Sequence, residues 1–204
     1  MTLILKKKLM KMKNRINILY MNIPNILTLL RVALIPIFVV VFYLPLKCAH
    51  IATSLIFMFA SLTDWLDGYL ARTLKQISAF GKFLDPVADK LMVAVALVLI
   101  VGEYQGKFNV TLTIPAAIIV GREIVISALR EWMAEVGKSK SVAVSFLGKV
   151  KTAFQMTALT LLLAEVAVFQ GILINIGIIL LWLSAALTLW SMIIYLRAAH
   201  KELQ

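Results

Sequence analysis

The sequence predicts an all-α, polytopic membrane protein with six transmembrane helices. The chain has 204 residues, of which 62% are hydrophobic and only 15% are charged, whereas soluble domains are usually near half apolar and about a quarter charged. Uncharged stretches lie at 51–63, 91–102 and 166–196. The last exceeds the roughly 20 residues that a spanning helix needs, and the first two come near that length once their flanks are added. These stretches are continuous and do not alternate with polar residues, which argues against an outer-membrane barrel.

Each expected helix is an apolar stretch bounded by polar residues. The first is preceded by Asn22-Ile23-Pro24, which is typical of a helix start with proline in the first turn. Polar turns at 103–109, 137–141 and 169–171 separate later helices. The expected spans are residues 24–46, 51–74, 82–103, 111–134, 147–168 and 172–197.

The basic residues predict the orientation of these spans. The two termini and the two loops on their side hold 16 Lys and Arg residues, and the opposite side holds only Lys47 and Lys107. The positive-inside rule then puts both termini and the acidic stretch 63–90 in the cytoplasm. The excess of Lys and Arg in the loops of one side, where they can contact anionic lipid headgroups, also accounts for the net charge of +11. We therefore expect no nucleic-acid partner.

Four of the ten acidic residues lie in the stretch 63–90, between two apolar runs. Asp64 and Asp67 are three residues apart on one expected helix, and Asp85 and Asp89 are four apart on the next, so each pair shares a face. Carboxylates are costly in lipid and repel one another, which favours a hydrated cavity with neutralising cations. Oxygen ligands without His or Cys favour Mg²⁺ or Mn²⁺, and two such ions would balance the four charges.

Small residues and an arginine accompany these carboxylates. Gly68 and Ala71 follow on the face of the first pair, and Gly81 precedes the second pair, so a ligand can approach the backbone there. Arg72 offers a planar donor to phosphate. The combination indicates a diphosphate site. The alternatives are helix capping with ion pairing to nearby Lys and Arg, or a divalent-cation transporter.

The stretch resembles the signature of the CDP-alcohol phosphotransferase family, D-x2-D-G-x2-A-R-x8-G-x3-D-x3-D, from Asp64 to Asp89 without departure. Further segments look like the bacterial phosphatidylglycerophosphate synthase branch of that family: 22–38, 121–135, 141–156 and 187–196. Members of this branch join CDP-diacylglycerol to sn-glycerol 3-phosphate and release CMP. The resemblance therefore implies a phospholipid-synthesising enzyme in a bacterial cytoplasmic (inner) membrane. Relatives that use serine, inositol phosphate or phosphatidylglycerol as acceptor share the motif and remain alternatives.

The resemblance also implies residue roles and an assembly. Asp64, Asp67 and Asp85 would bind metal, and Asp89 would both bind metal and act as the catalytic base. The family is often dimeric, so a homodimer is compatible with it. The expected CDP-diacylglycerol site comprises the other signature positions, a loop serine and three residues of the first span: Gly68, Ala71, Arg72, Ser78, Gly81, Asn25, Thr28 and Arg31.

The second substrate would be a phosphate monoester, which is nearly dianionic at neutral pH and needs a cationic pocket. The candidates lie in or near the fourth and fifth expected spans: Arg122, Arg130, Lys149 and Lys151. Plain pairing with the neighbouring Glu123 and Glu131 is the alternative for the arginines. For the lysines the alternative is snorkelling to headgroups.

A basic N-terminal extension, residues 1–21, precedes the six-helix domain at 22–204. Apolar residues at helical spacing among its lysines fit an interfacial helix, and a solvated basic tail fits equally well. Members of the branch tend to begin close to the sequence MNIPN, which here starts at Met21. We therefore expect residues 1–20 to be dispensable for insertion and activity.

The predicted topology can be tested with a reporter fused after Gln204. We expect a reporter that is active only in the cytoplasm to be active in this fusion, because the basic loops hold both termini on that side. A reporter that works only outside the cytoplasm, fused at the same position, is the control. Activity of that second fusion would contradict the topology.

Overall fold

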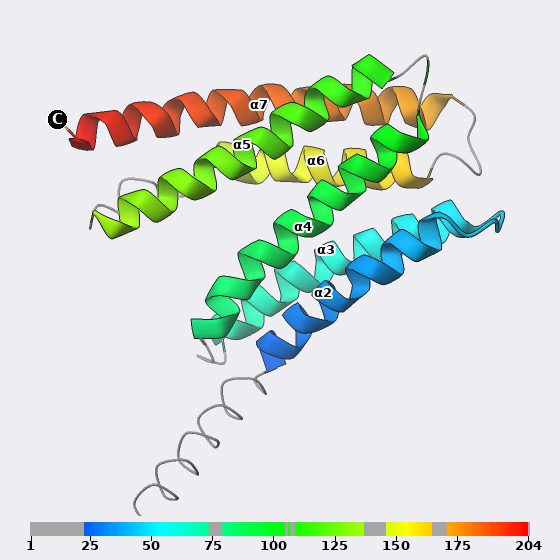
Figure 1. The fold of residues 1–204 in the computed structure, drawn as a ribbon, viewed down its shortest axis with the longest axis horizontal. Helices are drawn as coiled ribbons and strands as arrows, with labels where there is room; N and C mark the ends of the chain where they lie inside the picture. Colours follow the sequence, from blue (N-terminus) through cyan, green and yellow to red (C-terminus); the bar gives the residue numbers. More distant parts are fainter. Residues whose placement is uncertain are drawn as a thin grey trace, which may run out of the picture. The chain divides into compact units, whose positions relative to one another are not determined.

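The computed structural model describes residues 23–73, 79–104, 106, 109–136, 146–164 and 171–203. Within these ranges all regular structure is helical, in agreement with the predicted all-α class, and Figure 1 shows its course. The helices in chain order are α2 (Ile23–Phe42), α3 (Ala49–Thr73), α4 (Ala79–Glu103), α5 (Asn109–Glu135), α6 (Phe146–Ala164) and α7 (Ile172–Leu203).

The order of the helices agrees with the prediction, but several ends do not. The first helix stops at Phe42 and not near residue 46, because Pro45 disfavours helical backbone at Leu44. The last helix continues to Leu203, beyond the expected end at 197. Its final turns are rich in Ala, Lys and Leu, which favour helix without needing lipid around them.

Three of the described helices are long and apolar enough to cross a membrane: Asn25–Phe42 in α2, Asn109–Glu135 in α5 and Ile172–His200 in α7. The segments Ala49–Thr63 and Val150–Ala164 are apolar but shorter. These helices are typical of an integral membrane protein. Six complete spans, and their orientation, remain predictions.

The chain divides into two compact units. The first comprises Met1–Val40 and Ile56–Val93, and the second comprises Val41–Leu55 and Ala94–Gln204. In the first unit, α2 packs on α3 through Phe38 and Phe57, two fully buried rings whose centroids lie 6.2 Å apart.

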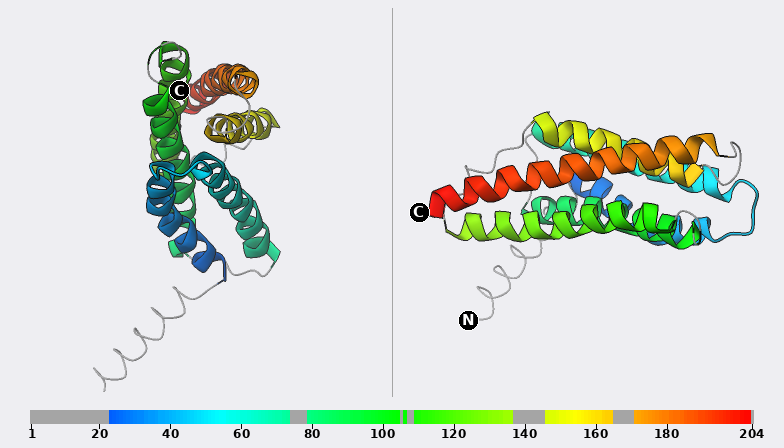
Figure 2. Two further views of the ribbon diagram at one scale, coloured as in Figure 1. Left: turned by 90° about the vertical axis from the view of Figure 1, so that its right-hand side faces the viewer. Right: turned by 90° about the horizontal axis from the view of Figure 1, so that it is seen from above.

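In the second unit, α7 packs along both α5 and α6, as Figures 1 and 2 show. A hydrophobic cluster joins α5 to α7 and contains Ile126, Met133, Tyr195 and Ala199. Between α6 and α7 the contact is close at Gly177, where an added Cβ would lie 2.7 Å from Leu162 Cγ. A side chain at this position would therefore displace the Leu162 side chain or move the two helices apart.

Replacement of Gly177 by valine tests this contact. We expect Gly177→Val to destabilise the protein by about 2–3 kcal/mol, because the added methyl groups overpack a buried contact. The thermal unfolding midpoint of the detergent-purified protein measures the change. Gly102→Val is the matched control, because an added Cβ at this helical glycine meets nothing within 4 Å. Equal midpoints for the two variants would contradict the close packing of α6 on α7.

Candidate functional site

Two of the predicted aspartates lie on α4 in the first unit. Asp85 and Asp89 are one turn apart and half-buried. The hydroxyl of Thr28, on α2, donates a hydrogen bond of 2.5 Å to Asp85 Oδ1. The structure thus places Thr28, a predicted substrate-binding residue, in hydrogen-bond contact with Asp85, a predicted metal ligand.

The polar residues of α2 face inward. Asn25, Thr28 and Arg31 recur at intervals of three and are at most 1% exposed, whereas Ile26 and Leu30 on the same helix are exposed. Burial of a guanidinium among apolar groups is costly unless polar groups surround it. This inward polar face is therefore compatible with a substrate-facing role for α2.

The remaining signature residues are only partly described. The backbone of α3 is helical through Thr73, so the expected register of Asp64, Asp67, Gly68, Ala71 and Arg72 holds, but their side chains lie outside the described part, as does Ser78. Gly81 is buried in the first turn of α4.

The described side chains near Asp85 offer oxygen ligands, which suit a hard divalent cation. Asp85, Asp89 and the Thr28 hydroxyl are oxygen donors of the kind that Mg²⁺ and Mn²⁺ prefer. Among the described side chains, no three His, Cys, Asp or Glu come together. A full ligand set would therefore require Asp64 and Asp67.

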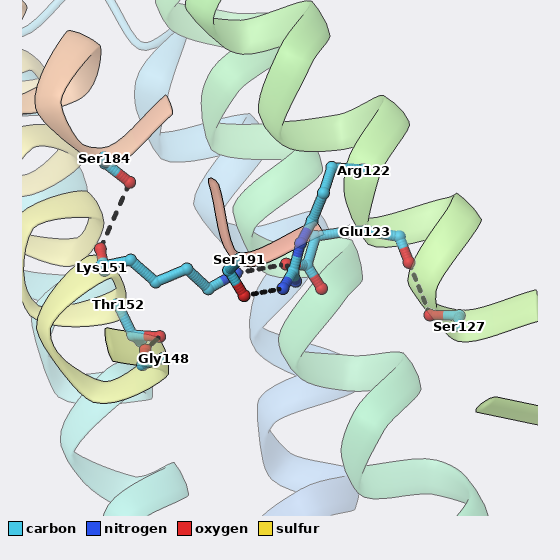
Figure 3. Close-up of polar contacts among 8 residues, drawn as sticks. All are labelled: Arg122, Glu123, Ser127, Gly148, Lys151, Thr152, Ser184 and Ser191. Carbon is cyan, nitrogen blue, oxygen red and sulfur yellow. Dashed lines mark hydrogen bonds and ion pairs between the residues drawn. The ribbon is translucent and has the colours of Figure 1, made fainter. Parts of the chain in front are cut away.

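A second cluster of polar side chains lies in the second unit and connects α5, α6 and α7 (Figure 3). Glu123 on α5 accepts two hydrogen bonds at one oxygen, Oε1: 2.7 Å from Arg122 Nη1 and 2.9 Å from Lys151 Nζ on α6. Arg122 Nη2 donates to Ser191 Oγ on α7 at 3.1 Å. We call these four residues, Arg122, Glu123, Lys151 and Ser191, the cation cluster.

The cation cluster carries excess positive charge in a sheltered place. The side chains of Arg122 and Lys151 are 6% and 9% exposed, and that of Glu123 is 28% exposed. One carboxylate cannot neutralise two cations, and charges inside membrane proteins are costly enough to be a mark of function. The surplus charge favours an anionic ligand.

Arg130 lies near the cation cluster, because it contacts the same aromatic ring as Arg122. Its guanidinium carbon lies 5.6 Å from the centroid of the Tyr195 ring, and that of Arg122 lies 5.8 Å from the same centroid. Both distances are within the range of a cation–π contact. Three of the four predicted cations thus gather around Glu123 and Tyr195, whereas the side chain of Lys149 lies outside the described part.

Helix α7 contributes residues that the sequence analysis did not single out. Ser184 donates to the Lys151 carbonyl oxygen at 3.2 Å, and Ser191 and Tyr195 contact Arg122. Together with Thr188 these residues stand at positions i, i+4, i+7 and i+11 of α7 and form a polar stripe on an otherwise apolar helix. The stripe consists of Ser184, Thr188, Ser191 and Tyr195. This stripe was the available signal in the sequence.

Comparison with known proteins identifies relatives over most of the chain. The sequence model described as CDP-alcohol phosphatidyltransferase matches residues 21–190. The chain is 58% identical to a Pectobacterium atrosepticum protein over 182 residues, which cover 89% of this chain and 97% of the relative. It is 56% identical to a Pseudomonas fluorescens protein over 185 residues, or 90% and 93% of the two chains. Both relatives are named CDP-diacylglycerol–glycerol-3-phosphate 3-phosphatidyltransferase.

Proposed function

The chain belongs to the CDP-alcohol phosphatidyltransferase family, and we propose that it transfers the phosphatidyl group of CDP-diacylglycerol to sn-glycerol 3-phosphate. The products are phosphatidylglycerophosphate and CMP. The observation that carries the proposal is the 58% identity, over 89% of the chain, to a relative named for this reaction. We place the enzyme in a bacterial cytoplasmic membrane, with its active site on the cytoplasmic side.

The first unit supplies the residues for the lipid substrate. Asp64, Asp67, Asp85 and Asp89 would hold the metal, which we take to be two Mg²⁺ or Mn²⁺ ions. When bound, a divalent cation draws charge from the diphosphate and eases the departure of CMP. The Thr28 hydroxyl, which already holds Asp85, would keep that carboxylate oriented. The nucleotide and diphosphate would contact Gly68, Ala71, Arg72, Ser78, Gly81, Asn25 and Arg31.

The chemistry is one displacement at phosphorus. The 1-hydroxyl oxygen of sn-glycerol 3-phosphate bonds to the phosphorus that bears diacylglycerol, and the bond from that phosphorus to the CMP oxygen breaks. Asp89 takes the proton of the attacking hydroxyl, which raises the nucleophilicity of its oxygen. The lipid tails can remain in the bilayer throughout, because only the headgroup reacts.

The cation cluster supplies the residues for the soluble substrate. A phosphate monoester carries nearly two negative charges at neutral pH. Arg122 and Lys151, held side by side on Glu123, would bind those charges, together with Arg130 and Lys149. Arg122 can present two nitrogens to phosphate at once, which fixes the orientation of the acceptor.

One assay decides the acceptor. Purified protein is given CDP-diacylglycerol with sn-glycerol 3-phosphate, serine, inositol phosphate or phosphatidylglycerol, each with and without Mg²⁺, and CMP release is measured. The proposal requires release that depends on sn-glycerol 3-phosphate and on the metal. Release with a different acceptor only would replace the proposed substrate, and transport of Mg²⁺ without any CMP release would place the protein in another class.

Asp89→Asn tests the catalytic base. We expect CMP release to fall by at least 10²-fold, because an amide cannot accept the proton, while the thermal unfolding midpoint stays close to that of the parent protein. Glu103→Gln, at the exposed end of the same helix, is the control and should retain full activity. Activity of Asp89→Asn near the parent level would remove Asp89 from this role.

Arg130→Ala tests the acceptor pocket. We expect the apparent KM for sn-glycerol 3-phosphate to rise roughly tenfold, since one charge-assisted contact is lost, with little change in the KM for CDP-diacylglycerol. Arg197→Ala, which removes an exposed cation of α7, is the control and should change neither constant. An equal rise in both constants for Arg130→Ala would show that Arg130 has no part in acceptor binding.

A further inference from the structure

On α5 and α7, two buried polar atoms have no hydrogen-bond partner within the described chain: Arg122 Nε and Thr188 Oγ1. Thr188 is 0% exposed and Arg122 is 6% exposed. The other two nitrogens of Arg122 are satisfied by Glu123 and Ser191. Leaving a buried donor unpaired is costly, so two such atoms on neighbouring helices call for an explanation.

Helical register places Thr188 beside the cation cluster. Ser184, Thr188 and Ser191 occupy positions i, i+4 and i+7 of α7, which lie on one face of a helix, and all three are buried. Ser184 contacts the Lys151 carbonyl oxygen, and Ser191 contacts the Arg122 guanidinium. The Lys151 side chain extends from the first of these contacts toward the second (Figure 3). Thr188 lies between the two contacts on the same face.

The hydroxyl of Thr188 differs from those of three other threonines that lie in apolar helices. Thr53, Thr63 and Thr160 each donate to a carbonyl oxygen of the preceding turn, at 2.7 to 2.8 Å. This is the usual way in which a helical threonine satisfies its hydroxyl. Because Thr188 does not make this bond, its hydroxyl remains available to another group.

The chemistry of the two atoms defines that group. Arg122 Nε can only donate a hydrogen bond, whereas a threonine hydroxyl can donate or accept. A ligand that satisfies both atoms must therefore offer acceptor oxygens. The surplus positive charge of the cation cluster requires that ligand to be anionic, and a phosphate group has both properties.

We propose that Thr188 of α7 is a binding residue for the phosphate of the acceptor substrate, whose oxygens accept hydrogen bonds from Thr188 Oγ1 and Arg122 Nε. This inference rests on the proposed function, which supplies the phosphate monoester. Both atoms are covered by protein, so a side chain must move when the phosphate binds. Glu123 is the most exposed of the three charged side chains, so a shift of its side chain would give the phosphate access to the cations.

Valine in place of Thr188 tests the inference, because it keeps the shape and removes the hydroxyl. In the purified full-length protein we expect Thr188→Val to raise the apparent KM for sn-glycerol 3-phosphate roughly tenfold, as for a lost hydrogen bond to a charged group. The KM for CDP-diacylglycerol should stay within about twofold. The unfolding midpoint should be unchanged or higher, because an unpaired hydroxyl has been removed.

Two further variants separate binding from packing. Thr188→Ser retains the hydroxyl and should restore the KM for sn-glycerol 3-phosphate to near the parent value. Thr53→Val removes a buried hydroxyl that already has a backbone partner and should change neither KM. A parent-like KM in Thr188→Val would overturn the inference, and so would an equal rise in both KM values with a lowered midpoint.

Inorganic phosphate gives a readout that does not depend on turnover. We expect phosphate to raise the unfolding midpoint of the parent protein, and Thr188→Val to need roughly tenfold more phosphate for the same rise. If the parent protein responds to phosphate but releases no CMP with sn-glycerol 3-phosphate, the proposed function fails and the phosphate site stands. If the parent and Thr188→Val respond alike, or neither responds, the role of Thr188 is wrong.

Discussion

Lipid offers no hydrogen bonds, and this constraint explains why polar side chains of the apolar helices α2 and α7 are buried. On α2 the polar residues Asn25, Thr28 and Arg31 are buried while apolar neighbours are exposed. On α7 the serines and the threonine of the polar stripe are likewise buried. The interior of each unit thus contains the groups that a soluble protein would place on its surface. Along the apolar helices, the interior of a unit is the place where these polar groups can find partners.

The same constraint explains the form of the cation cluster. A lysine and an arginine on different helices are both nearly covered, and each would be costly alone. One glutamate oxygen makes their burial tolerable and fixes their positions relative to each other. Ser191 and Tyr195 complete the arrangement from α7 without adding charge. The result is a stable group of residues that still carries a net positive charge.

The sequence predicted the family, the all-helical class and the order of the helices, because apolar stretches and the aspartate signature are local patterns. Helix ends were less predictable. Apolarity marks where lipid surrounds a chain, whereas α2 stops because of Pro45 and α7 continues through a polar segment of high helix propensity. Arg122 and Lys151 could be chosen from charge alone. Pairing of Arg122 with Glu123 is the alternative that the sequence analysis gave, and the structure contains it. That Lys151 shares this carboxylate, and that α7 takes part, depends on three helices meeting, which no local pattern specifies.

Gly177 has a bearing on the site although it has no side chain. It lies seven residues before Ser184 on the buried face of α7, and its lack of a Cβ is what lets α6 come close at Leu162. The same proximity brings the Lys151 backbone within reach of Ser184 two turns later. The absence of a Cβ at Gly177 therefore helps to set the distance between α6 and α7, and with it the spacing of the residues proposed to bind phosphate. Selectivity for the acceptor could thus be altered during evolution without any change to a charged residue, through the volume allowed at this one position.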